Sequence, residues 1–172
     1  MRMIYVVGCE HPIQSSDPYP LLETSSAVKE QREHFQQLVE LVLSEGKVKL
    51  VAEEWGLLSE SFAQALARAH TVRWVDINPG LDDLDTLGIP RDYIDPIKYT
   101  PEQRQGWFQR RESVMLEGIR SARGAAESLL VICGFCHFGP LADRLGNGER
   151  VERIDYRNEN WYRSDIFFPV SF

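Results

Sequence analysis

Residues 129–137 read LLVICGFCH, and this stretch decides the fold that the sequence predicts. Residues 129–133 are the most apolar run, which is typical of a strand buried on both faces. Gly134 ends the run, and His137 follows three residues later. A buried strand with polar residues just beyond its carboxyl end is the pattern expected of a parallel sheet that carries a site at this edge.

Further apolar runs predict the remaining strands, and helical patterns separate them. Strands are expected at 3–7, 48–52, 71–75 and, as a more polar edge strand, at 151–155. Helices are expected from Ser25 or Ser26 to Gly46, from about Ser59, from Thr100 with Pro101 and Gln103 in a capping box, and from Gly139-Pro140 to Gly146. This alternation predicts one α/β domain over residues 1–172, with a mainly parallel central sheet sandwiched by helices.

Charge and composition limit the partners. The chain has 19 Lys and Arg against 26 Asp and Glu, a formal net charge of -7, without a basic run. Nucleic acid and anionic membranes are therefore not expected as partners, because both require a positive surface. No apolar run approaches the roughly 18 residues that span a bilayer. With three cysteines and no signal-like N-terminus, the chain is expected to be cytoplasmic. The expected partner is a small-molecule or peptide substrate. The oligomeric state stays open.

The candidate site residues follow separate predicted strands. Glu10 and His11 come after the first strand, Glu53 and Glu54 after the second, and His137 after the run 129–133. The carboxyl ends of parallel strands meet at one edge, so these side chains are expected to converge there. Because strand side chains alternate, one of Glu53 and Glu54 should face the site and the other solvent or a salt bridge.

Histidines with carboxylates can hold a divalent metal. The expected ligands are His11, Glu53 and His137, and Mn, Co, Ni, Fe or Zn would suit them. Alternatively, the same cluster activates water without a metal. Glu10 or Glu54 would be the general base. The expected start of a helix after His137 would disfavour its imidazolium form and keep the ring free as a ligand.

Arg111 is predicted to border this site. It falls in the middle of the apolar face of the helix that begins after Thr100, where an unpaired charge would cost several kcal/mol. The strand-end carboxylates would supply its partner, and Arg111 would then stabilise developing oxyanion charge. A snorkelling arginine or a purely structural ion pair is the alternative.

The run Cys133-Gly134-Phe135-Cys136-His137 matches the pattern of covalent haem attachment and contains a C-x-x-C pair. We expect neither function, because Cys133 completes a buried strand whereas those motifs lie at exposed turns. Cys133 is therefore expected to be buried and reduced, without covalent haem. A zinc site that includes Cys9 and Cys136 lacks zinc-finger spacing. The Pro-rich segments 12–24 and 77–99 are long enough to suggest functional loops.

The order of these motifs resembles a superfamily that joins the TIKI/TraB metalloproteases, the erythromycin-esterase-like proteins and the ChaN-like haem-binding lipoproteins. The matching residues are Gly8-Cys9-Glu10-His11, Glu53-Glu54, Arg111-Glu112 and Gly134-Phe135-Cys136-His137. The resemblance runs from about residue 3 to residue 155 and implies a minimal core of that α/β fold. It also implies a metal-dependent or His/Glu-dependent hydrolase, whose substrate the sequence does not identify.

Two functions are therefore compatible with the sequence. The first is a hydrolase, with a metal-assisted mechanism preferred, in which His11, His137 and a glutamate act on water. The second is a module of the same fold that binds a small molecule, haem or a protein without catalysis.

Overall fold

A computed structural model describes residues 2–15, 26–45, 47–57, 59–124, 127–155, 157 and 162. In this part of the chain, five parallel strands form one sheet with the order β3-β2-β4-β1-β5. The strands are β1 (Ile4–Cys9), β2 (Val48–Glu53), β3 (Arg73–Asp76), β4 (Ser128–Gly134) and β5 (Val151–Asp155). The predicted α/β class is confirmed, and β5 lies at an edge as expected.

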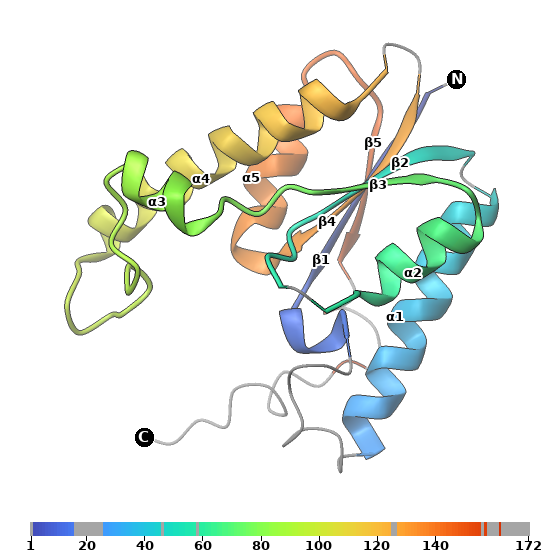
Figure 1. The fold of residues 1–172 in the computed structure, drawn as a ribbon, viewed down its shortest axis with the longest axis horizontal. Coiled ribbons are helices and arrows are strands. Elements are labelled where there is room, and N and C mark those ends of the chain that lie inside the picture. Colours follow the sequence, from blue (N-terminus) through green and yellow to red (C-terminus); the bar gives the residue numbers. More distant parts are fainter. Residues whose placement is uncertain are drawn as a thin grey trace.

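Helices cover both faces of the sheet (Figure 1). The helices α1 (Ser26–Glu45) and α2 (Phe62–Ala69) lie on one face, and α4 (Pro101–Ala122) and α5 (Phe135–Leu145) lie on the other. Residues of β4 alternate between the two layers: Leu130 and Ile132 pack with the first, and Leu129 and Val131 with the second. All seven residues of β4 are buried, which explains its continuous apolar run.

The connections place a topological switch point at the carboxyl end of β4. From β1 and β2, the two neighbours of β4, the chain continues to α1 and α2 on one face. From β4 it continues to α5 on the opposite face. In open parallel sheets, ligands bind where neighbouring strands lead to helices on opposite faces. The fold itself therefore points to the ends of β1, β4 and β2.

The start of α5 differs from the sequence-based expectation. The helix begins at Phe135, not at Gly139-Pro140, and Pro140 lies inside it. The reason is the apolar stripe, which extends back to Phe138 and continues through Leu141, Ala142 and Leu145 toward the sheet. His137 therefore lies in the first turn of α5 and not before the helix.

The segment from Ile77 to Tyr99 contains the short helix α3 (Leu81–Thr86) and lies beside the beginning of α4 (Figure 1). Leu84, Ile89 and Tyr93 form a small core of their own within it. Thr100 and Gln103 cap α4 reciprocally, as the sequence predicts. The segment also brings two polar side chains to Arg111, as described below.

Some expectations fall outside the described residues, namely the helix cap at Ser25, the helix end at Gly46 and most of segment 12–24. The short 3-10 helix η1 (His11–Ile13) marks the beginning of that segment. Within the described residues, no helix combines the length and apolar character needed to cross a bilayer. Cys133 is a buried free cysteine, as expected.

Candidate active site

Gly134 lies at the carboxyl end of β4, where groups from three strand ends meet around the position that a Cβ atom would take. A Cβ atom at Gly134 would lie 3.4 Å from Oε2 of Glu54, 3.7 Å from Sγ of Cys136 and 3.8 Å from Nε2 of His11. We call this space, bounded by Glu54, Cys136 and His11, the Gly134 notch. It lies at the switch point, because β2 leads to Glu54, β1 to His11, and β4 to Cys136.

Glu54 is the buried anion at the centre of this group. Its Oε1 accepts a hydrogen bond of 2.8 Å from Nη2 of Arg111, and its Oε2 accepts one of 2.8 Å from the backbone N–H of Gly134. Burial alone would raise the pKa of Glu54, but His137, His11, Arg111 and the Gly134 N–H together lower it. A lowered pKa makes Glu54 a poor proton acceptor, so the structure does not favour the general-base role expected for it.

His137 is buried between two carboxylates. Its Nδ1 lies 3.1 Å from Oε1 of Glu112, and its Nε2 lies 3.7 Å from Oε1 of Glu54. Burial lowers the pKa of His137, but the Cys136 thiol and the Glu112 and Glu54 carboxylates raise it to about 10. The nearby anions thus favour the imidazolium form of His137, which is the opposite direction from the effect expected of the helix N-terminus.

His11 is oriented by a relay through Gln14 to Glu53. Nδ1 of His11 lies 2.8 Å from Oε1 of Gln14, and Nε2 of Gln14 donates to Oε1 of Glu53 at 2.9 Å. Because an amide oxygen only accepts, Nδ1 of His11 is the donor. In the neutral imidazole, Nε2 then carries the lone pair, and Nε2 is the atom at the Gly134 notch.

Glu53 lies on the opposite side of β2 from Glu54, as the alternation of strand side chains requires. However, it faces neither solvent nor a salt bridge: its Oε2 accepts from Ser61 Oγ and, at 2.8 Å, from Trp74 Nε1. Burial raises its pKa to about 7, although the hydrogen bonds from Ser61, Trp74 and Gln14 lower it. The structure thus places Glu54, rather than Glu53, beside the two histidines.

Arg111 reaches a strand-end carboxylate, as predicted. In addition to Glu54, its guanidinium donates at 2.8 Å to Oδ1 of Asn78 and also to the hydroxyl of Tyr93. The exposed fraction of Arg111 is only 7%, so this charge is held in place entirely by partners inside the protein. The contact with Glu54 confirms the predicted pairing. A catalytic role for Arg111 stays a prediction.

The position of Asn78 is fixed by the turn after β2. Gly56 has a φ of +71°, and a Cβ there would lie 2.1 Å from Nδ2 of Asn78. Asp76 accepts hydrogen bonds from the backbone N–H groups of Trp55, Gly56 and Asn78. Asp76 is therefore a turn cap, and it holds the loop that supplies Asn78 to Arg111.

Glu10 interacts with His11 and also with a residue outside this group, Tyr162. Its Oε1 accepts a hydrogen bond from the hydroxyl of Tyr162, and burial raises its pKa despite that bond. Both Tyr162 and His11 interact with the Glu10 carboxylate, and the base role expected for Glu10 stays a prediction.

A divalent ion at this edge would be held through His11, Glu54 and His137. Both imidazoles have Nδ1 fixed by a second group, which is the arrangement that orients histidine ligands. However, both oxygens of Glu54 are already engaged by Arg111 and Gly134. Among the described residues, no group of three or more His, Cys, Asp or Glu is arranged to hold a metal. The metal-assisted form of the site therefore stays a prediction.

Several residues of this network lack a simple sequence signal. Gln14 and Tyr93 reach the site through the folding of loops, and nothing in their spacing indicates it. Glu112 could have been recognised, because it follows Arg111 and is a second charge on the buried side of α4. Cys136 belongs to the C-x-x-C pattern, for which no function is expected, yet it is exposed and borders the Gly134 notch.

No family model matches this sequence, and no curated protein or solved structure is significantly similar to it. The resemblance to the TIKI/TraB, erythromycin-esterase-like and ChaN-like proteins therefore stays a prediction from short motifs.

Proposed function

We propose that this chain is a hydrolase whose reaction takes place at the Gly134 notch, with His11 as general base. The observation that supports the proposal most strongly is the meeting of His11 Nε2 and Glu54 Oε2 at Gly134, where the fold has its switch point. The substrate class that we propose is a small molecule or a peptide.

His11 and Glu54 would hold the attacking water between them. The relay through Gln14 directs the lone pair of His11 Nε2 into the notch, which is the requirement for removing a proton from water. Glu54 is held as an anion and can accept the second hydrogen bond of that water. General-base catalysis of this kind contributes roughly 10²–10⁴-fold in rate.

Arg111 and His137 would balance the charge that develops during attack. Both cations contact Glu54 from the side away from the notch, so they fix its position and offset its negative charge. The first turn of α5 adds the positive end of a helix beside Gly134. Preorganised positive charge near a water-poor site is a major source of transition-state stabilisation.

The test compares the hydrolysis of two probe compounds, p-nitrophenyl acetate and bis-p-nitrophenyl phosphate, by the parent and by His11→Gln. His34→Gln is the matched control, because His34 lies on α1 and pairs with Glu30 of the same helix. We expect turnover in the parent and the control and a loss of about 10²-fold or more in His11→Gln. Equal rates in all three proteins would contradict the proposal.

A metal requirement is tested separately. Protein purified without a metal-affinity column should be analysed for bound Mn, Fe, Co, Ni and Zn, and its turnover measured with and without a chelator. Glu54→Gln is the comparison variant, because it removes the anion shared by the histidines. Bound metal that is lost in Glu54→Gln, together with chelator-sensitive turnover, would establish the metal-assisted form of the reaction.

A further inference from the structure

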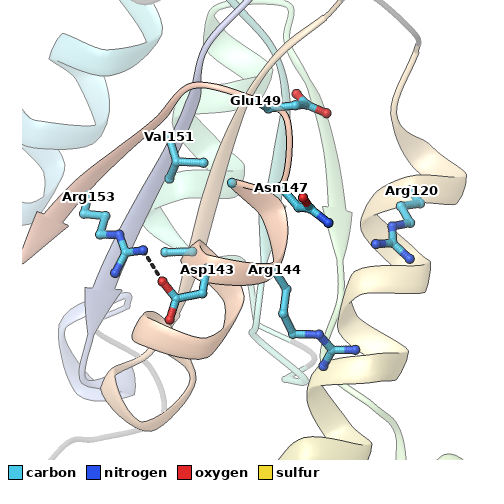
Figure 2. Close-up of a pocket in the computed structure, with 9 residues that line it drawn as sticks. Arg120, Asp143, Arg144, Asn147, Glu149, Val151 and Arg153 are labelled. Atoms are coloured by element: carbon cyan, nitrogen blue, oxygen red, sulfur yellow. Dashed lines mark hydrogen bonds and ion pairs between the residues drawn. The ribbon is translucent and has the colours of Figure 1, made fainter.

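We propose that a second site, at the opposite end of the sheet, binds a phosphate group of a small molecule through Arg120 and Arg144. The site is a surface pocket of about 750 Å³, a volume within the range of small-molecule sites. Its lining residues come from α4, from α5 with the turn that follows, and from the first half of β5 (Figure 2). It is separate from the Gly134 notch. Val151 in the pocket wall is the first residue of β5, whereas the notch lies at the carboxyl end of the sheet.

The carboxylates of this pocket already have cationic partners. Asp143 pairs with Arg153, the contact drawn in Figure 2. Glu149 pairs with Arg123 at 2.8 Å and with Arg2 at 3.3 Å. The acidic groups are therefore neutralised without using the remaining two arginines of the pocket.

Arg120 and Arg144 are the cations that stay without a carboxylate. Within the described residues Arg120 has no hydrogen-bond or ion-pair partner, and Arg144 donates only to the hydroxyl of Ser113, at 3.2 Å. Figure 2 shows Arg120 extending from α4 toward the segment that carries Arg144 and Asn147. In a chain with a net charge of -7, two unneutralised guanidinium groups at one pocket form a local positive field.

A phosphate group fits this arrangement better than a carboxylate does. Arg120 and Arg144 are separate guanidinium groups on different helices, and Nη2 of Arg144 reaches Ser113 on α4, the helix that carries Arg120. A phosphate presents oxygens in several directions and carries up to two negative charges, whereas a carboxylate is planar and satisfies one guanidinium fork. The amide of Asn147 offers a further donor at the same pocket.

The experiment is a calorimetric titration of the full chain with inorganic phosphate at low ionic strength, with succinate as the carboxylate probe. The variants are Arg120→Gln and Arg144→Gln. The control is Arg68→Gln, which removes an exposed arginine on α2 that is paired with Glu60. Thermal unfolding of each variant verifies the fold.

We expect one saturable phosphate site, weakened about tenfold or more by either pocket variant and changed less than about twofold by the control. No saturable phosphate binding would overturn the proposal, as would binding that both pocket variants retain at parental strength. With either result, the two arginines would only interact with the partly negative C-terminal ends of their helices. Replacing them would then change the stability of the fold and not phosphate binding. Succinate binding as tightly as phosphate would overturn the assignment to phosphate groups.

Discussion

Arg111 connects the loop after β3 to the buried end of β2. Its guanidinium joins Asn78, Tyr93 and Glu54, which are far apart in the sequence. A buried ion pair offsets its desolvation cost only when its hydrogen bonds are satisfied. The contribution of this ion pair to the free energy of unfolding should therefore appear as a coupling energy between Arg111 and Glu54 in a double-mutant cycle. It should not appear as a separate contribution from either residue.

Arg111→Met should lower the free energy of unfolding by about 3 kcal/mol, because it leaves the buried Glu54 carboxylate without the guanidinium that is hydrogen-bonded to it. Combining it with Glu54→Gln should cost less than the sum, with a coupling energy of about 1–3 kcal/mol from urea unfolding. The exposed pair Arg68 and Glu60, treated in the same way, should show less than about 1 kcal/mol. Additive effects at Arg111 and Glu54 would mean that the contact does not stabilise the fold.

Glu53 should make stability depend on pH. Its pKa is raised from 4.5 to about 7, so the folded protein favours the protonated form. The contribution of Glu53 to the free energy of unfolding is therefore fully present below about pH 4.5 and is lost as the pH rises through about 7. The total loss is on the order of 3 kcal/mol. Measured as the difference between the parent and Glu53→Gln, the unfolding free energy should fall over that window. A difference that stays constant, or that rises with pH, would refute this.

At the scale of elements, the packing of β1 against α5 sets how closely the strand ends approach. Gly8 lies where α5 crosses β1, and a Cβ there would come within 2.8 Å of Phe135 and 2.9 Å of Phe138. The absence of a side chain at Gly8 thus lets α5 begin directly at the end of β4. Because α5 begins at this point, Cys136 lies in its first turn and borders the notch.

Gly8→Ala should therefore destabilise the fold by about 1–3 kcal/mol through overpacking against the two phenylalanine rings. Gly106→Ala is the control, because Gly106 lies inside α4 and a Cβ there would meet nothing within 4 Å. Thermal or urea unfolding should show that the control is unchanged or more stable by up to about 1 kcal/mol. Equal effects at both positions would contradict the close packing of α5 on β1.

Sequence patterns predicted elements well where burial is simple. The strand at 129–133 was predictable because a strand covered on both faces must be apolar throughout. The start of α5 was not predictable from Gly139-Pro140, since proline normally marks a first helical turn, and here the apolar stripe overrides that signal.

The two histidines could be placed at one edge because parallel strands share their direction. The choice of Glu54 over Glu53 depends on which face of β2 meets α4, which only the packing of α4 decides.

At the scale of the whole molecule, the two described sites lie at opposite ends of one sheet. The notch lies at the carboxyl end of β4, and the arginine pocket lies beside the beginning of β5. Between them, β4 is fully buried and most residues of β1 and β2 are buried, with Cys9 and Cys133 among the core residues. Of the three cysteines, only Cys136 is exposed.

Thiol labelling should report this organisation. In the native protein one thiol, Cys136, should react rapidly with a disulfide reagent, and burial should protect Cys9 and Cys133, since it also raises the pKa of both thiols. All three should react in denaturant, and Cys136→Ala should remove the rapid native phase. Rapid native labelling of more than one thiol would show that the core is more open than the structure indicates.

The central claim, that chemistry occurs at the Gly134 notch, is tested most directly by filling it. Gly134→Ala adds a Cβ at ordinary contact distance, 3.4 Å from Oε2 of Glu54, so the fold should persist with an unfolding midpoint close to that of Gly106→Ala. The same methyl group occupies the space where water would meet His11 and Glu54. We expect hydrolysis of the probe esters to fall about 10²-fold or more in Gly134→Ala while Gly106→Ala retains the parental rate. Parental turnover in a stably folded Gly134→Ala protein would contradict the assignment.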